Sequence, residues 1–189
     1  MIRGRIGVAR GNARAALEDA AAAIAFGTTS NNDEILYYGA ALEARCRQVQ
    51  ADEKGSLEAC DTFLSRWSET GGLSGRSMEL CEIASPLAEA NRHQDIRDAA
   101  SRLPVASRWR EALLLVADTR YADAALLYEA IGSAPLAADA DVLAADQAHA
   151  EGRAADAAHH TERVFAFADR TGATVYRNQA ERSTKAASA

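Results

Sequence analysis

His149, His159 and His160 lie close in sequence to several carboxylates, and these residue types together bind zinc and similar ions. Such ions require three or four ligands that converge from fixed directions. Neighbouring residues on a helix point about 100° apart, so at most one histidine of the adjacent pair can face His149. The spacing therefore favours surface or partly packed histidines, and we predict neither a metal site nor a cofactor.

A cysteine nucleophile with a histidine base is the second chemistry to consider. Cys60 and Cys81 precede His93, but no glycine-rich elbow or oxyanion motif accompanies them. With Cys46 the cysteines are odd in number and fall at apolar positions of helical patterns, as buried reduced thiols do. The glycine-rich stretch "GGLSGRS" at 71–77 lacks the lysine of a phosphate-binding loop and is predicted to be a linker. We predict that the chain is not an enzyme.

The adjacent residues Tyr37 and Tyr38 point in different directions on a predicted helix. If Tyr38 joins the buried stripe of that helix, Tyr37 lies on another face together with Arg45 and Gln48. In an array of helical repeats this face lines the concave surface, where partner peptides bind. Tyr37, Arg45 and Gln48 are therefore the candidate partner-binding residues. The alternative is an exposed tyrosine beside an arginine with no function.

Length, charge and hydropathy limit the class of protein. The chain has 189 residues, 48% of them hydrophobic, which suffices for one domain with a buried core. Its net charge of −6 argues against general binding of nucleic acids, whose phosphates require basic surfaces. The sequence contains no long run of uncharged apolar residues and no apolar signal-peptide core. We expect a cytoplasmic protein that binds neither nucleic acid nor membrane.

Apolar residues recur with the 3.6-residue period of helices along most of the chain, and no stretch alternates with the two-residue period of strands. Many of these residues are alanines, which suit helices packed at close range. Pro86 lies inside one pattern and should kink or split that helix, because proline lacks an amide hydrogen. The predicted helices span residues 11–26, 33–50, 55–69, 77–91, 94–103, 107–118, 121–131, 136–150, 153–170 and 174–186.

An internal repeat organises these helices. The stretch from 119 to 132 nearly recurs at 152 to 165, and both fit the second helix of a tetratricopeptide unit, in which small residues permit a close crossing with the first helix. Weaker copies begin at Gly11, Gly55 and Gln94. We predict one domain over residues 1–189, an all-α, tetratricopeptide-like right-handed solenoid of about ten helices, capped by the polar helix at 174–186.

The first repeat is predicted to be incomplete, because too few residues precede the helix at 11–26 to form its partner. That helix has an apolar face that needs cover. We predict self-association through this N-terminal helix; the alternative is that it folds back onto 33–50 and 55–69. The residues before it form a short basic arm that could meet an acidic partner. The apolar face consists of Ala16, Ala20, Ala23 and Ile24, and the basic residues are Arg3, Arg5, Arg10 and Arg14.

Residues 107–189 carry a family resemblance, strongest in "YADAALLYEAIGS", "AEGRAADAAHH" and "VFAFADRTGATVYRNQAE". These stretches resemble the C-terminal tetratricopeptide-like region of large bacterial signalling ATPases, which include adenylate-cyclase proteins and LuxR-type multidomain regulators. The sequence departs from the family at Asp118-Thr119, where a Gly-Asp turn is usual, and at Asp141, where an arginine is usual. The resemblance implies a repeat region whose ATPase, cyclase or DNA-binding parts would lie upstream.

From these features we expect a non-catalytic interaction or regulatory module that transmits binding of a protein or peptide partner to a signalling output carried elsewhere. The competing class is a small-molecule receptor or an enzyme whose cavity is not recognisable from sequence. A binding module should present a groove without convergent titratable residues, whereas a receptor or enzyme should contain a pocket with perturbed acids or bases.

Overall fold

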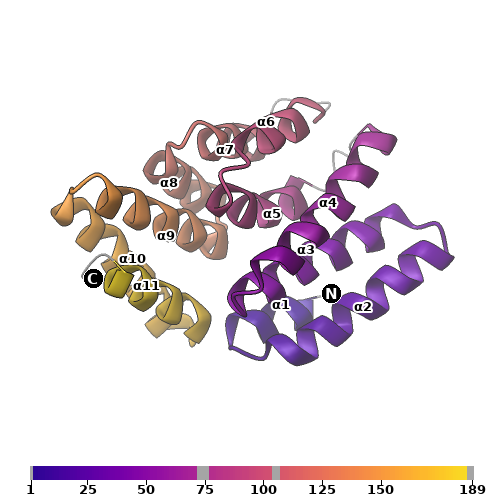
Figure 1. The fold of residues 1–189 in the computed structure, drawn as a ribbon, viewed down its shortest axis with the longest axis horizontal. Helices are drawn as coiled ribbons and strands as arrows, with labels where there is room; N and C mark the ends of the chain where they lie inside the picture. Colours follow the sequence, from indigo (N-terminus) through magenta and orange to yellow (C-terminus); the bar gives the residue numbers. More distant parts are fainter. Residues whose placement is uncertain (1, 72–76, 104–106, 187–189) are drawn as a thin grey trace.

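The computed structural model describes residues 2–71, 77–103 and 107–186. In these residues all regular structure is helical, and the helices follow one another with short turns (Figure 1). They are α1 (Ile2–Ala9), α2 (Ala13–Thr29), α3 (Asp33–Val49), α4 (Glu53–Thr70), α5 (Ser77–Glu89), α6 (His93–Ser101), α7 (Arg108–Ala117), α8 (Tyr121–Ile131), α9 (Ala134–Ala150), α10 (Ala154–Thr171) and α11 (Thr174–Ala186).

The ten helices predicted from the apolar period are all present, as α2 to α11. Helix α5 continues through the buried Pro86 to Glu89, so of the two outcomes expected there, a kink or a split, the split does not occur. One expectation was wrong. Residues 2–9, predicted to be a basic arm, form the additional helix α1. Most of the predicted linker at 71–77 lies outside the described residues.

A turn of one type joins each odd-numbered helix to the even-numbered helix that follows it, and each of these five turns contains one residue with positive φ. The N–H of this residue bonds to the carbonyl three residues earlier, and the next N–H bonds to the carbonyl five earlier. The residues with positive φ in these five turns are Gly11, Ala51, Asn91, Thr119 and Gly152. The same turn also joins α2 to α3, at Asn31, and α8 to α9, at Gly132. The predicted repeats coincide with the second helices of the five hairpins that begin at α1, α3, α5, α7 and α9.

Thr119 is an unfavourable residue for this turn, because a β-branched side chain is strained at a φ of 57°. We expect Thr119→Gly to raise the free energy of unfolding by about 1 kcal/mol, since relief of strain exceeds the entropy cost of glycine. The matched change is Gly152→Thr, where φ is 73° and no atom lies within 4 Å of the added Cβ. It should lower the free energy of unfolding by a similar amount. Urea denaturation measures both, and equal stabilities for all three proteins would contradict the role of backbone strain.

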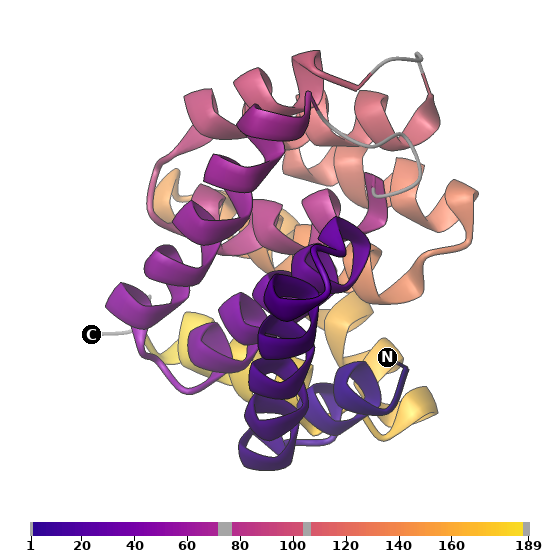
Figure 2. The ribbon, with the colours of Figure 1, turned by 90° about the vertical axis from the view of Figure 1, so that its right-hand side faces the viewer.

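Five of the odd-numbered helices, all except α7, contact one another at the centre of the molecule. Helix α3 contacts α1 and α5, α5 contacts α9, and α9 contacts α11. Helix α11 in turn contacts α1, so that the first and last helices meet. Helices α1–α4, α5–α8 and α9–α11 appear as successive groups around the centre in Figure 1, and Figure 2 shows the molecule turned so that α2 lies in front.

Helix α1 completes the first hairpin, and α1 and α3 together cover the apolar face of α2. The alternative that α2 folds back onto residues 33–50 is therefore confirmed, whereas α4 (residues 53–70) is not among its main contacts. Val8 of α1 packs with Ala16 and Ala20 of α2, both almost fully buried, and with Leu42 of α3. Ile24 is half-buried. The expectation that the first repeat lacks a partner was therefore wrong, and the face on which predicted self-association depended is covered within the chain.

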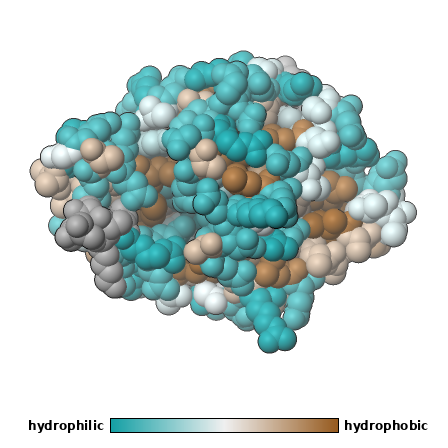
Figure 3. Space-filling view, in the orientation of Figure 1, coloured by the Kyte–Doolittle hydropathy of each residue, from teal (hydrophilic) through white to brown (hydrophobic). Residues whose placement is uncertain are grey.

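Most of the molecular face drawn in Figure 3 is hydrophilic, with hydrophobic side chains showing between the helices.

The basic residues of this segment also have partners in the chain. Arg3 pairs with Asp19 of α2. Arg5 bonds to Glu79 and Glu82 of α5, and its guanidinium lies 5.1 Å from the centre of the Tyr38 ring. The ion pairs of Arg3 and Arg5 therefore connect α1 to α2 and to α5.

Candidate functional site

A group of polar side chains lies buried where the odd-numbered helices meet. Nη2 of Arg45 on α3 donates to Oδ1 of Asp139 on α9 at 2.5 Å, and both side chains are less than a tenth exposed. Arg45 also donates to Gln48, whose Nε2 donates to Oγ of Ser85 on α5 at 3.0 Å. Tyr176 of α11 bonds to the same ion pair. These five residues are named the central polar cluster.

Burial and charge act against each other in this cluster. Burial raises the pKa of Asp139, while the charge of Arg45 and hydrogen bonds from Arg45 and Tyr176 lower it, with burial prevailing. Burial alone would lower the pKa of Arg45, but Asp139, with smaller contributions from Tyr176 and Glu89, offsets this and the pKa is raised. Burial also raises the pKa of the Tyr176 hydroxyl. Buried ion pairs seldom stabilise a fold more than apolar residues of similar size would. Stability alone therefore does not explain why Arg45 and Asp139 are buried here.

A cavity of about 240 Å³ opens beside the cluster. It lies toward the N-terminal ends of α5, α9 and α11, and Arg45, Asp139 and Tyr176 form its polar end. The remaining wall is mainly hydrophobic, which is the usual composition of a small-molecule site. We name it the central cavity. Its hydrophobic lining includes Ile6, Val8, Leu42, Leu136, Phe167 and Val175.

A second ion pair borders the central cavity. Nε of Arg5 lies 2.6 Å from Oε1 of Glu82, and Nη2 of Arg5 lies 3.1 Å from Oε1 of Glu79. Burial raises the pKa of Glu82 to about 7, although the positive charge of Arg5 opposes the shift. A carboxyl group at the wall of the cavity therefore changes protonation near neutral pH. Perturbed groups in cavities are typical of functional sites.

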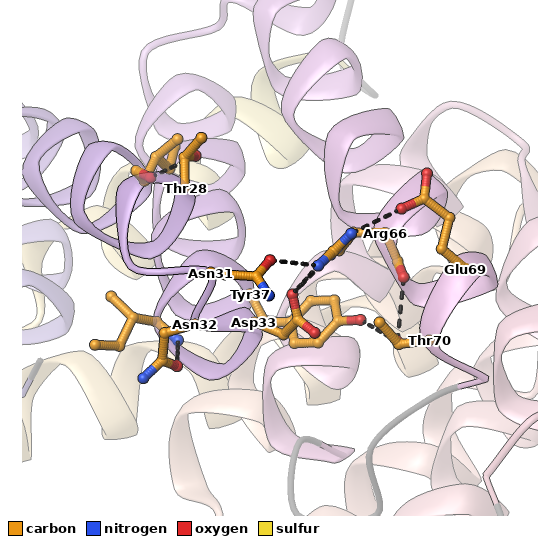
Figure 4. A network of polar contacts seen from close by, with 10 residues as sticks. Thr28, Asn31, Asn32, Asp33, Tyr37, Arg66, Glu69 and Thr70 are labelled. Atoms are coloured by element: carbon orange, nitrogen blue, oxygen red, sulfur yellow. Dashed lines mark hydrogen bonds and ion pairs between the residues drawn. The ribbon is translucent and has the colours of Figure 1, made fainter.

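The structure separates the three residues predicted to bind a partner. Arg45 and Gln48 belong to the central polar cluster. Tyr37 does not, and the expectation that it faces a concave surface was wrong. Its ring is fully buried against Phe63 and Trp67 of α4, because α3 is covered on several sides. Figure 4 shows its hydroxyl directed to Thr70, with an O···O distance of 2.6 Å.

Sequence reasoning missed Asp139, Tyr176, Glu82 and Arg5. One signal was available in α9, where Asp139 interrupts a run of alanine and leucine that is otherwise suited to burial. Asp141 interrupts the same run, and an acidic residue at a buried helical position requires a partner. The partner of Asp139 is 94 residues away in sequence, so the helical pattern alone did not identify it.

The other groups considered for chemistry do not belong to the central polar cluster. All three cysteines are free and buried, and burial raises the pKa of Cys60 and Cys81 to about 12, far from that of a reactive thiolate. Nε2 of His93 lies 2.7 Å from the Tyr121 hydroxyl. Nδ1 of His160 lies 2.8 Å from Asp141. Within the described ranges, no three residues of the types that ligate metals come together as a site.

Comparisons with protein-family models, with curated proteins and with solved structures find no match for this chain. Among the helices of the described residues, none combines the length and the apolar character needed to cross a membrane. The site must therefore be interpreted from its own geometry.

Proposed function

We propose that this protein is a non-catalytic regulatory module that binds a small molecule in the central cavity. One observation carries the proposal: a mainly hydrophobic cavity ends on the buried group formed by Arg45, Asp139 and Tyr176. A pocket with perturbed acids is what distinguishes a small-molecule receptor from a groove for peptides. The proposal therefore favours the receptor over the protein-interaction module.

The walls of the cavity limit the chemistry of the ligand. The cations Arg5 and Arg45 are already paired with carboxylates, so a charged ligand would bring an uncompensated charge. A neutral, mainly apolar molecule with one hydrogen-bonding group fits better. The volume of about 240 Å³ exceeds the roughly 150 Å³ of an engineered cavity that accepts benzene. We infer a ligand about the size of one substituted ring.

Helical repeats provide the regulatory part of the proposal. We infer that the five hairpins form a tetratricopeptide-like right-handed solenoid with α11 as its cap, supported by their common turn and by the repeat in the sequence. The resemblance to the C-terminal regions of signalling ATPases suggests an output domain elsewhere. Ligand binding between α1, α3, α5, α9 and α11 would then bias how these helices pack, and a protein partner would detect the change.

Glu82 supports a second candidate function. A carboxyl group with a pKa of about 7 at a cavity wall is suited to proton transfer, as in general acid–base catalysis. In that case the same cavity would hold the substrate of an enzyme. Turnover of a bound compound, lost in Glu82→Gln, would favour this candidate over the receptor.

The receptor proposal is tested with small neutral ring compounds such as phenol, benzyl alcohol and indole. We expect binding at micromolar to millimolar concentration by NMR titration. Ala9→Phe, which fills the cavity from α1, should weaken binding by at least about tenfold. Ala22→Phe, on the exposed face of α2, is the matched control and should leave binding unchanged. Equal binding to both variants, or no binding to the native protein, would contradict the proposal.

A further inference from the structure

A second cleft, of about 360 Å³, lies on the other side of the central polar cluster. The central cavity is lined by Glu82 of α5, Asp139 of α9 and Tyr176 of α11, and the cleft is lined by residues further along the same helices. Gln48 of the cluster reaches its wall. We name it the acidic cleft, and its lining from these helices includes Glu89, Val142, Asp146 and Gln179.

The acidic cleft has an excess of negative charge. Among the described residues that line it, Glu53, Glu89 and Asp146 are acidic and Arg182 is basic. The C-terminal ends of α3 and α5 also reach the cleft and add partial negative charge. The N-terminal end of α4 is there too, but Glu53 in its first turn offsets the positive end of that helix. Glu89 is exposed at the cleft. Desolvation by the surrounding residues raises its pKa, and Asp139 and Asp146 raise it further, against a hydrogen bond from Gln48 and the charge of Arg45.

The side-chain oxygen of Gln179 lacks a hydrogen-bond donor among the described residues, an observation that is independent of the charges. The Gln179 side chain lines the cleft and is only 7% exposed. Its buried Oε1 accepts no hydrogen bond from the residues that the structure describes. An unsatisfied buried acceptor is costly, and a ligand that carries N–H groups would satisfy it.

We propose that the acidic cleft binds an alkylammonium group, a primary amine at the end of an aliphatic chain. Glu89 and Asp146 supply negative charge to the ammonium, and Gln179 supplies an acceptor. Leu57, Pro86 and Val142 supply an apolar wall for the methylene groups. A cleft of about 360 Å³ with such a wall suits an organic cation better than a bare metal ion.

The probes are 1,5-diaminopentane, its uncharged analogue 1,5-pentanediol, and Nα-acetyl-lysine amide, each titrated into the full chain by calorimetry. We expect 1,5-diaminopentane to bind at least about tenfold more tightly than the diol. Tighter binding of the lysine derivative would identify the source as a protein side chain, and tighter binding of the diamine would identify a free amine. Both results support the ammonium site.

Glu89→Gln should weaken diamine binding by at least about tenfold, whereas Glu58→Gln, an exposed acid of α4 that does not line the cleft, should leave it unchanged. Gln179→Met keeps the size of the side chain and removes the acceptor, so it should weaken binding severalfold even if Glu89→Gln folds poorly. Ala9→Phe should leave diamine binding intact, which separates this site from the central cavity. Equal binding of diamine and diol, or no effect of either cleft substitution, would overturn the proposal.

Discussion

Replacing Arg45 with methionine is expected to lower the free energy of unfolding by about 3–5 kcal/mol. The change leaves the Asp139 carboxylate buried without its ion-pair partner. The loss should be smaller at about pH 5 than at about pH 8, because an unpaired buried carboxyl group takes up a proton readily. Urea denaturation followed by circular dichroism measures the change.

The double variant Arg45→Met/Asp139→Leu decides whether the unpaired charge causes the loss. It removes both charges, and we expect it to recover most of the native stability. Arg120→Met is the matched control, since Arg120 forms an exposed ion pair with Asp123, and it should change the stability by no more than about 1 kcal/mol. If the double variant is as unstable as Arg45→Met, lost packing rather than unpaired charge is the cause.

The second large effect concerns pH. Because burial raises the pKa of Glu82 from its ordinary 4.5 to about 7, the folded protein binds a proton between these values that the unfolded chain releases. The free energy of unfolding should therefore rise as the pH falls from about 7 toward 4.5. At about 1.4 kcal/mol for each pH unit the gain is at most about 3 kcal/mol, and partial solvent access reduces it.

Glu82→Gln isolates this contribution from other titrating groups. Glutamine cannot take up the proton, and Arg5 retains its contact with Glu79. We expect the stability of the variant to depend less on pH between about 5 and 7 than that of the native protein, with the difference measured by urea denaturation at several pH values. Parallel pH profiles for the two proteins would show that Glu82 titrates in its ordinary range.

Ten of the helices could be predicted because their signals are local: apolar residues at helical spacing, with turn residues between them. Helix α1 could not be predicted this way. Its sequence contains Gly4 and Gly7, which disfavour a helix by themselves. Gly4 instead serves the packing, since a Cβ there would lie 2.5 Å from a methyl group of Leu42. The helix depends on contacts with α2, α3 and α5 that no local pattern contains.

The candidate site was predictable only in part, for a similar reason. Periodicity assigned Arg45 and Gln48 to one face of a helix, and that face does meet the centre of the molecule. It did not reveal that the whole circumference of α3 is crowded by neighbours, which buries Tyr37 as well. It also did not reveal that α9 and α11 approach the same point. Which helix faces which is decided by tertiary packing over long sequence separations.

The contact between α1 and α11 bears on how the molecule unfolds. A linear stack of repeats can fray from either end, because each terminal unit has one neighbour only. Here Ala9 of α1 packs against the cluster that includes Phe167 and Tyr176 of the last helices, so both terminal hairpins have neighbours on two sides. Opening one end removes contacts from the other end as well. We therefore expect the helices to unfold as one cooperative unit, and a ligand held at the centre would stabilise all the hairpins at once.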